Sequence, residues 1–425
     1  MLRTMSRLAA AGLLLATLVV SHERPSLAQA PSGEMPVFEK DNSWPKIPNN
    51  WVLGAVPAVA TDRRDHVWIL HRPLLVPEAQ RAQAAPPVLE FDDKGKFVRA
   101  WGGPSQAYEW PSNEHGITVD YKNNIWISGN NPTDDMLLKF TIDGKFIAQF
   151  GKRGASTGNA DTVNVNRPAD LFVYPKTNEL FVADGYGNRR LIVFDADTGK
   201  FKRMWGAFGN PPDTNPPAGA PGAARGRGDG AARGAGAPAG AGDQARGGGG
   251  GGRGRGAPNF DTEGPGPDTF TNPVHAVKVS NDGLVYVGDR GNRRIQVFTL
   301  DGKFVTQAWV NRAGPGGSST AGLAFSPDSA QRFLYNASFG DARIAVLDRK
   351  SLQVLYQFGV RGTEPSQIVN AHLIAVNSKG DIYVGEVMPG NRAHRFAYKG
   401  MSKTVPANAN PPSETAPARG AEPAK

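Results

Sequence analysis

The stretch from His275 to Gln307 reads HAVKVSNDGLVYVGDRGNRRIQVFTLDGKFVTQ and has the layout of one β-propeller blade. It holds four short apolar strand candidates, at 275–279, 284–289, 294–298 and 303–307. The first two are joined by Ser280-Asn281-Asp282-Gly283, whose residue types favour tight turns. Four strands in this order, repeated along a chain, predict a propeller.

Five further units with the same layout occur, and they begin near Pro57, His115, Ala169, Ala321 and His372. Most are spaced by roughly 45 to 55 residues, which is the period of blades with longer loops. The sixth unit lacks a fourth strand before the polar C-terminal tail, so we expect the segment around Met35 to Phe38 to supply it. The sequence therefore predicts an all-β, six-bladed β-propeller over residues 31–400, closed by pairing of the two ends.

Composition supports this fold class and limits the chemistry. The 425 residues include 52 glycines and 34 prolines, far more turn formers than a helical protein tolerates. The chain contains no cysteine, which excludes disulfides, thiolate metal sites and a cysteine nucleophile. Any metal must be held by His, Asp, Glu or backbone oxygen.

The N-terminus has the pattern of a signal peptide over residues 1–30. Arg3 and Arg7 precede the apolar run from Leu8 to Val20, and Ala28-Gln29-Ala30 offers a small-residue cleavage site. A membrane anchor is the alternative, but the run is shorter than the roughly 20 residues of a spanning helix. We expect an exported protein, periplasmic or extracellular, without stable membrane insertion after cleavage.

The formal net charge of +9 would suggest a nucleic-acid or membrane-surface partner. Much of the excess lies in a Gly/Ala/Arg-rich stretch, at about 210–270, between the third and fourth blades. Its arginines include Arg225, Arg227, Arg233, Arg246, Arg253 and Arg255. Such sequence behaves as a flexible loop, so we expect a disordered insert, no nucleic-acid partner and a second disordered segment at 401–425.

Two segments resemble the NHL repeat family. They are Asp289-Arg-Gly-Asn292-Arg-Arg294-Ile-Gln-Val-Phe298 and Asp184-Gly-Tyr-Gly-Asn188-Arg-Arg190-Leu-Ile-Val-Phe194. The resemblance covers most of residues 50 to 400 and implies an NHL-type propeller. It says little about function, because propellers include both enzymes and binding modules.

Histidine falls at one repeat register in every second blade. The first position of the innermost strand carries Pro57, His115, Ala169, His275, Ala321 and His372 in chain order. Blades two, four and six of a sixfold ring lie about 120° apart around the channel, so we expect the three imidazoles to converge. A single histidine here would be structural, whereas three favour a divalent metal, zinc by preference, with an open position as in catalytic sites.

Residues just after the second strand of a blade return to the same end of the channel. Arg72 and Tyr186 hold such positions. An arginine offers a fork of donors for a substrate carboxylate, and a tyrosine beside a metal can act as a base. The alternatives are a surface ion pair for Arg72 and a packing aromatic for Tyr186.

The segments around these five residues resemble the zinc-dependent peptidyl-α-hydroxyglycine α-amidating lyases. The matching segments are Leu70-His-Arg72, Glu114-His115-Gly-Ile, Asp184-Gly-Tyr186-Gly-Asn188-Arg, Pro273-Val-His275-Ala-Val and Asn370-Ala-His372-Leu. The resemblance implies His115, His275 and His372 as zinc ligands, Tyr186 as general base and Arg72 as the contact to a carboxylate or transition state. It implies a carbon–nitrogen lyase that splits a hemiaminal-type peptide or small-molecule substrate into an amide and glyoxylate.

The chain departs from that family in three respects. Leu373 follows His372 where the family has an aspartate that helps to hold calcium, so a Ca²⁺ site is not expected. The family disulfides and a copper monooxygenase domain are absent, so the substrate can differ.

Two other functions stay open. One is a non-catalytic NHL propeller that binds a protein or glycan, and the other is a calcium-dependent lactonase-like propeller. The channel positions carry His, Ala and Pro rather than acidic or amide ligands, which disfavours the lactonase. The remaining blade histidines, His66, His71 and His394, are expected to be structural or exposed.

Overall fold

A computed structural model describes residues 33–213, 264–312 and 319–410. The chain divides into two compact units, Met1–Gly33 and Glu34–Lys425, and only Gly33 of the first unit is described. The second unit holds the propeller. Within the described residues, every helix is too short or too polar to cross a bilayer.

Six antiparallel sheets form the blades, and the strands of each follow one another from the axis outward. Blade 1 consists of β2 (Ala58–Thr61), β3 (Val67–Leu70), β4 (Val88–Phe91) and β5 (Phe97–Trp101). Blade 2 consists of β6 (Glu114–Val119), β7 (Asn124–Gly129), β8 (Met136–Thr141) and β9 (Phe146–Gly151). Blade 3 consists of β10 (Asp170–Tyr174), β11 (Glu179–Asp184), β12 (Arg190–Asp195) and β13 (Phe201–Trp205).

Blade 4 consists of β14 (Val274–Val279), β15 (Leu284–Asp289), β16 (Arg294–Thr299) and β17 (Phe304–Trp309). Blade 5 consists of β18 (Gly322–Phe325), β19 (Phe333–Ser338), β20 (Arg343–Asp348), β21 (Val354–Phe358) and the short β25 (Ala409–Asn410). Blade 6 consists of β22 (Ala371–Val376), β23 (Ile382–Glu386), β24 (Arg392–Ser402) and β1 (Met35–Asp41). The 3₁₀ turns are η1 (Pro73–Leu75), η2 (Glu78–Gln83), η3 (Ala207–Gly209) and η4 (Arg290–Asn292).

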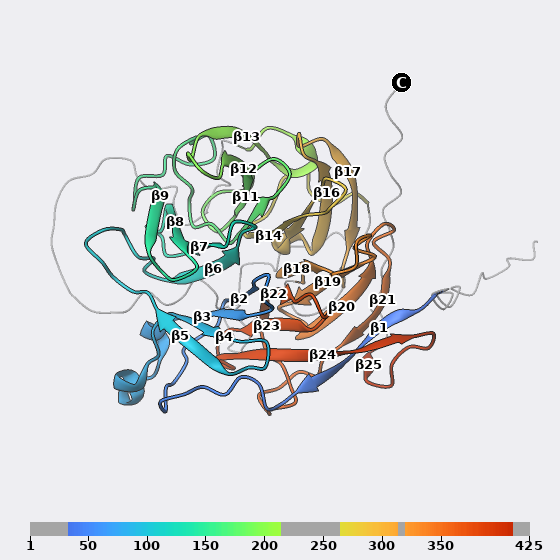
Figure 1. Cartoon of the computed structure of the whole chain (residues 1–425). Coiled ribbons are helices and arrows are strands. Elements are labelled where there is room, and N and C mark those ends of the chain that lie inside the picture. Colours follow the sequence, from blue (N-terminus) through green and yellow to red (C-terminus); the bar gives the residue numbers. More distant parts are fainter. Residues whose placement is uncertain (1–32, 214–263, 313–318, 411–425) are drawn as a thin grey trace, which may run out of the picture. The chain divides into compact units, whose positions relative to one another are not determined.

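The blades follow one another in chain order around a common centre (Figure 1). Each innermost strand contacts the innermost strands of both neighbouring blades, so β2, β6, β10, β14, β18 and β22 form a closed ring. This arrangement confirms the six-bladed, all-β architecture that the repeats predict. It also directs the first residue of every innermost strand to one end of a shared channel.

The ring is closed by its two ends, as expected from the incomplete sixth unit. Strand β1 pairs antiparallel with β24, and Phe38 lies opposite Tyr398. Phe38 is buried and stacks on Phe358 of blade 5, with ring centroids 5.4 Å apart. The N-terminal strand therefore contacts both of the last two blades.

Apolar side chains fill the spaces between the blades. The buried residues form six large clusters, and each cluster joins two adjacent blades. Blades 1 and 2, for example, meet through Trp68, Ile117 and Phe140, which are at most 3% exposed. Because alternate residues of a strand face opposite sides, each central strand contributes to both of its neighbouring interfaces.

Several predicted segments fall wholly or largely outside the described residues. These are the signal peptide at 1–30, most of the insert at about 210–270 and the end of the tail. At the C-terminus, paired structure continues beyond residue 400, because β24 extends to Ser402 and Ala409–Asn410 pairs with β21.

Candidate metal centre

The three channel histidines lie together at one end of the ring. One ring nitrogen of each of His115, His275 and His372 lies within 4.8 Å of the corresponding nitrogens of the other two. All three side chains are fully buried. The structure thus gathers the three residues that the repeat register predicts to converge.

A β-bulge places each of these histidines. The register of the innermost strand against the second strand shifts between Glu114 and Ile117, between Val274 and Ala276, and between Ala371 and Ile374. The corresponding strands of blades 1, 3 and 5 pair without a shift. Since a bulge re-aims a side chain, it explains how every second blade turns its histidine toward the axis.

Each histidine is also oriented by the neighbouring blade. Its Nδ1 contacts a backbone carbonyl oxygen, and the three distances are 2.8 Å for His115 to Ala169, 2.5 Å for His275 to Ala321 and 2.5 Å for His372 to Pro57. The three carbonyls belong to the same register position in blades 3, 5 and 1. Because a carbonyl oxygen only accepts, Nδ1 carries the proton and Nε2 keeps its lone pair.

The close approach of the strands depends on a small residue beside His115. A Cβ atom on Gly116 would lie 2.7 Å from the Ala169 carbonyl oxygen and 2.6 Å from Ser128 Oγ. The Ala169 carbonyl is the oxygen that orients His115. Glycine at this position therefore allows the contact that fixes the imidazole.

The donor set suits a divalent cation. Tyr186 Oη lies 3.0 Å from His115 Nε2 and 3.0 Å from His275 Nε2. Its single proton can serve only one of these two acceptors. Burial, with His372 and Arg290 nearby, lowers the pKa of His275 well below its usual range, so that ring is neutral. Three imidazoles with fixed outer hydrogen bonds are the ligands that zinc takes in open sites.

Tyr186 is held at the centre by two arginines. Arg290 Nη1 donates to Tyr186 Oη at 3.0 Å, and its guanidinium lies 4.1 Å from the centre of the Phe339 ring. The Arg167 guanidinium lies 5.7 Å from the centre of the Tyr186 ring. The sequence pattern did not single out Arg290. This residue directly follows the second strand of blade 4, close to where Arg72 and Tyr186 follow the second strands of blades 1 and 3.

Arg72 is buried and contacts the backbone beside His115. Its Nε donates to the Glu114 carbonyl at 2.7 Å, and its Nη2 lies 3.4 Å from Asn130 Oδ1. Burial raises the pKa of the Glu114 carboxyl to about 7, opposed by the hydrogen bond from Trp110 and by the charge of Arg72. The surface ion pair considered for Arg72 is not what the structure shows.

Buried acids at the ends of the second strands fix the loops that lead to the channel. Asp184 accepts from the Asn166 amide and pairs with Arg190, while Asp289 accepts from the Thr271 amide and pairs with Arg294. Both ion pairs are fully buried. The Asp184–Arg190 and Asp289–Arg294 pairs of the NHL-like segments therefore support the fold. From the same two segments, Tyr186 and Arg290 contact the histidine centre.

The remaining blade histidines have structural contacts. His71 is buried and accepts from the Gly54 amide, and His394 contacts the buried Glu386. His66 lies in a second group of possible ligands with Asp62 and Glu90. Arginines occupy that group, because Arg64 contacts both carboxylates and Arg99 pairs with Glu90. It does not have the character of a metal site.

The position after His372 offers no side-chain oxygen as a ligand for calcium. Leu373 is buried at the position after His372. A carboxylate does enter the channel from blade 3, at Asp170, but Lys278 of blade 4 neutralises it at 2.5 Å.

Comparisons with known proteins find two groups of relatives. No family model matches the chain. NHL repeat-containing protein 3 of Mus musculus is 27% identical over 363 residues, which cover 83% of this chain and 82% of the relative. Peptidyl-alpha-hydroxyglycine alpha-amidating lyase 1 of Drosophila melanogaster is 24% identical over 405 residues, which cover 87% of this chain and 61% of the relative.

Two further similarities are more distant or more partial. Peptidyl-glycine alpha-amidating monooxygenase B of Xenopus laevis is 24% identical over 380 residues, which cover 82% of this chain but 34% of the relative. Among solved structures, a streptogramin B lyase aligns with a TM-score of 0.45 and 13% identity, over 86% of this chain and 98% of that chain. The relatives of the chain are thus NHL-repeat proteins and amidating lyases.

Proposed function

We propose that this chain, a relative of NHL-repeat proteins and amidating lyases, is an exported zinc-dependent carbon–nitrogen lyase. Its substrate would be a hemiaminal that carries a carboxylate, of the peptidyl-α-hydroxyglycine type. The products would be an amide and glyoxylate.

One observation carries the proposal. His115, His275 and His372 each have Nδ1 fixed on a carbonyl, and Tyr186 Oη lies 3.0 Å from the lone-pair nitrogens of two of them. A channel that needed these histidines only for packing would not require three imidazoles oriented alike by backbone carbonyls, with two of them facing a phenol. The similarity to an amidating lyase over 87% of the chain supports the same chemistry.

The residues have complementary tasks in this reaction. Zinc, when bound by the three histidines, would act as a Lewis acid toward the substrate hydroxyl. Tyr186 Oη would accept the hydroxyl proton, and Arg290, which donates to that oxygen, would stabilise its ionised form. The oxygen electron pair then forms the glyoxylate carbonyl, the C–N bond breaks, and the nitrogen takes the proton from Tyr186 to become an amide. Arg72 would hold the substrate carboxylate.

The test is metal content of the purified mature protein, followed by an assay of glyoxylate release from α-hydroxyglycyl peptides. We expect about one zinc per chain, its loss when the three histidines are replaced by alanine, and zinc-dependent glyoxylate release. Circular dichroism would show whether the triple variant keeps its fold. Absence of stoichiometric metal after incubation with zinc would overturn the proposal.

A second candidate is a non-catalytic propeller that binds a protein or glycan. NHL repeat-containing protein 3 of Mus musculus has higher identity to this chain, at 27%, than the amidating lyase of Drosophila melanogaster, at 24%. This alternative predicts that zinc, if bound, stabilises the fold without any glyoxylate release. The same pair of measurements therefore separates the two candidates.

A further inference from the structure

A second site lies farther along the same channel. A cavity of about 350 Å³ is lined by residues from all six innermost strands and by the hairpins that follow β18 and β22. In β6 its lining begins at Ile117, two residues after His115, and ends at Val119, so it lies roughly 7 to 13 Å along the strand from the histidine. This size is within the range of small-molecule pockets.

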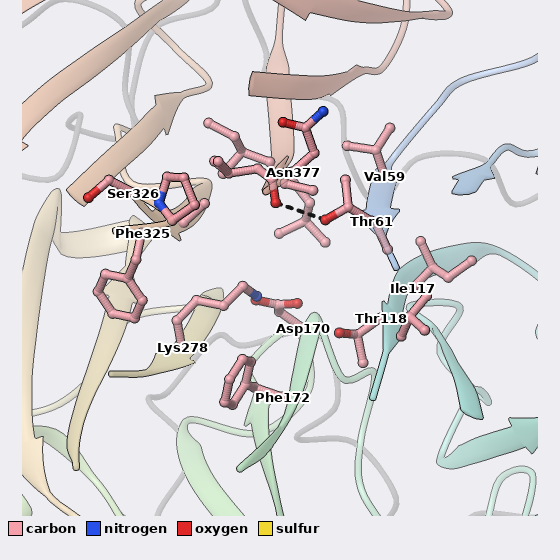
Figure 2. Close-up of a pocket in the computed structure, with 18 of the residues that line it drawn as sticks. Val59, Thr61, Ile117, Thr118, Asp170, Phe172, Lys278, Phe325, Ser326 and Asn377 are labelled. Carbon is pink, nitrogen blue, oxygen red and sulfur yellow. Dashed lines mark hydrogen bonds and ion pairs between the residues drawn. The ribbon is translucent and has the colours of Figure 1, made fainter. Parts of the chain in front are cut away.

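One ion pair forms part of the cavity wall, and Figure 2 labels both of its residues, Asp170 and Lys278. Lys278 Nζ lies 2.5 Å from Asp170 Oδ2 and 3.1 Å from the Val277 carbonyl oxygen. Asp170 Oδ2 also accepts from the Val277 amide at 3.1 Å. Asp170 is almost fully buried, and the Lys278 side chain is 17% exposed. A largely buried charged pair is costly unless its remaining hydrogen-bonding capacity is used.

The unused hydrogen-bonding groups of Lys278 and Asp170 can be identified. An ammonium has three N–H donors, and a carboxylate accepts through lone pairs on both of its oxygens. Among the described residues, Lys278 Nζ has only the two acceptors named above, and Asp170 Oδ1 has no donor. One donor and one acceptor therefore lie side by side in the cavity.

The charge balance narrows the class of ligand further. The pair is neutral as a whole, and no other charged side chain in the described part of the chain lines the cavity. A neutral group with an adjacent donor and acceptor, which is the arrangement in a primary amide, complements this neutral pair, whereas an anion or cation would find no opposite charge left to balance it.

Apolar side chains form one part of the remaining wall. Phe172 and Phe325 line the cavity with Val59 and Ile117, and all four are labelled in Figure 2. Aromatic rings favour contact with other rings in offset or edge-to-face arrangements. The polar group of a ligand can thus face the ion pair while its ring contacts these side chains.

We propose that this cavity binds a small uncharged molecule that carries a primary carboxamide on an apolar ring, with Lys278 donating to the amide oxygen and Asp170 accepting from the amide nitrogen. The site is separate from the histidine centre and does not depend on the activity proposed for it.

Three probes with one ring test the proposal: benzamide, benzoate and benzylamine. Their affinities for the full-length mature protein would be measured by ligand-observed NMR or calorimetry. We expect benzamide to bind, and benzoate and benzylamine to bind at least tenfold more weakly. Benzamide affinity should be the same with and without a zinc chelator, which separates this site from the histidine centre. Equal binding of a charged probe, or no binding of benzamide, would overturn the proposal.

Variants locate the binding in the cavity. Lys278→Met should weaken benzamide binding at least tenfold, and Thr118→Phe, which fills the cavity from β6, should abolish it. Lys139→Met is the matched control, because Lys139 is a buried lysine that contacts Asp197 and the Ala196 carbonyl away from the channel. Thermal unfolding of each variant would show that it is folded. Unchanged benzamide affinity in both cavity variants would overturn the assignment.

Discussion

Each channel histidine has one nitrogen engaged by the backbone of the next blade, which leaves only the other for a ligand. In metal sites such outer hydrogen bonds fix the tautomer and the ring orientation, and losing one typically lowers metal affinity 10- to 100-fold. The carbonyls of Ala169, Ala321 and Pro57 supply these bonds here. The main chain, rather than other side chains, therefore orients the three histidines.

Tyr186 can be tested separately from the metal ligands. Because the proposed reaction needs its phenol for proton transfer, Tyr186→Phe should lower kcat for glyoxylate release by about 10² to 10⁴. Zinc content should stay at the wild-type level. Tyr121→Phe is the control, since Tyr121 lies in the hairpin between β6 and β7, where it donates to Asn178 of the hairpin between β10 and β11. Wild-type turnover in Tyr186→Phe would remove the phenol from the mechanism.

His71 should make stability depend on pH. Burial lowers its pKa to about 4, against hydrogen bonds to the Ala85 and Pro86 carbonyls that favour the charged form. The folded pKa lies below that of the unfolded chain, so the unfolded state binds more protons between about pH 6.5 and 4 and stability falls as the pH drops through this window. We expect His71 to account for a loss of about 2 kcal/mol between pH 7.5 and 5.

The measurement for His71 is the free energy of unfolding in urea at both pH values. His71→Gln should lose about 2 kcal/mol less than the wild type across the same interval, because glutamine does not titrate there. The same pH dependence in both proteins would show that His71 does not control it.

At the residue scale, the sequence could predict which histidines meet but not how they are held. The repeat register alone identified His115, His275 and His372. Arg290 was not predicted because it lies in the NHL-like segment that begins at Asp289. That segment also supplies the buried Asp289–Arg294 ion pair, so its residues are explained by the fold alone. Arg72 and Tyr186 were placed at the correct end of the channel, and their catalytic roles stay predictions.

Among the structural elements, the bulges in β6, β14 and β22 determine where the channel residues point. Sequence periodicity places a residue in a strand, but a bulge depends on pairing with the neighbouring strand, which one strand's sequence does not encode. The strand order and the hairpins were predictable because each turn has its own residue signature, as in Ser280-Asn281-Asp282-Gly283. The register shift at each histidine could not be predicted in this way.

The second strand of blade 4 should depend strongly on its terminal acid. Asp289→Ala leaves the guanidinium of Arg294 buried without its carboxylate, and we expect the free energy of unfolding to fall by about 3 to 5 kcal/mol. Asp143→Ala is the control, because Asp143 pairs with Arg99 at the surface with its side chain 59% exposed and should cost less than about 1 kcal/mol. Urea denaturation of both variants would measure the difference. A similar small loss for both would mean that the Asp289–Arg294 pair contributes little net stability.

In the molecule as a whole, the ring is held closed by one N-terminal strand. Phe38 of β1 is 2% exposed and packs edge-on to Tyr335, with ring centroids 5.5 Å apart, as well as on Phe358. The expected closure was visible in the sequence because the sixth unit ended one strand short. The contact of this strand with blade 5 was not visible in the sequence, since it depends on the packing of three aromatic rings from distant segments.

Phe38→Ala should therefore destabilise the whole propeller by about 3 to 5 kcal/mol, the usual cost of removing a buried phenylalanine. Glu39→Ala, at the next and exposed position of the same strand, should change the unfolding free energy by less than about 0.5 kcal/mol. Thermal and urea unfolding would compare the two. An independent early transition confined to the N-terminal strand would contradict closure by Phe38.

Blades that carry a channel histidine alternate with blades that orient it through a carbonyl, so the centre depends on the order of the two kinds of blade. Each imidazole from an even blade is oriented by an odd blade, so the functional unit of this ring is a pair of blades, present three times. A descendant that lost an odd blade or gained an even one would place two histidine-bearing blades side by side and leave one histidine without the carbonyl that orients it. A change of two neighbouring blades at a time would keep the alternation and every histidine supported, although the number of ligands would change with it.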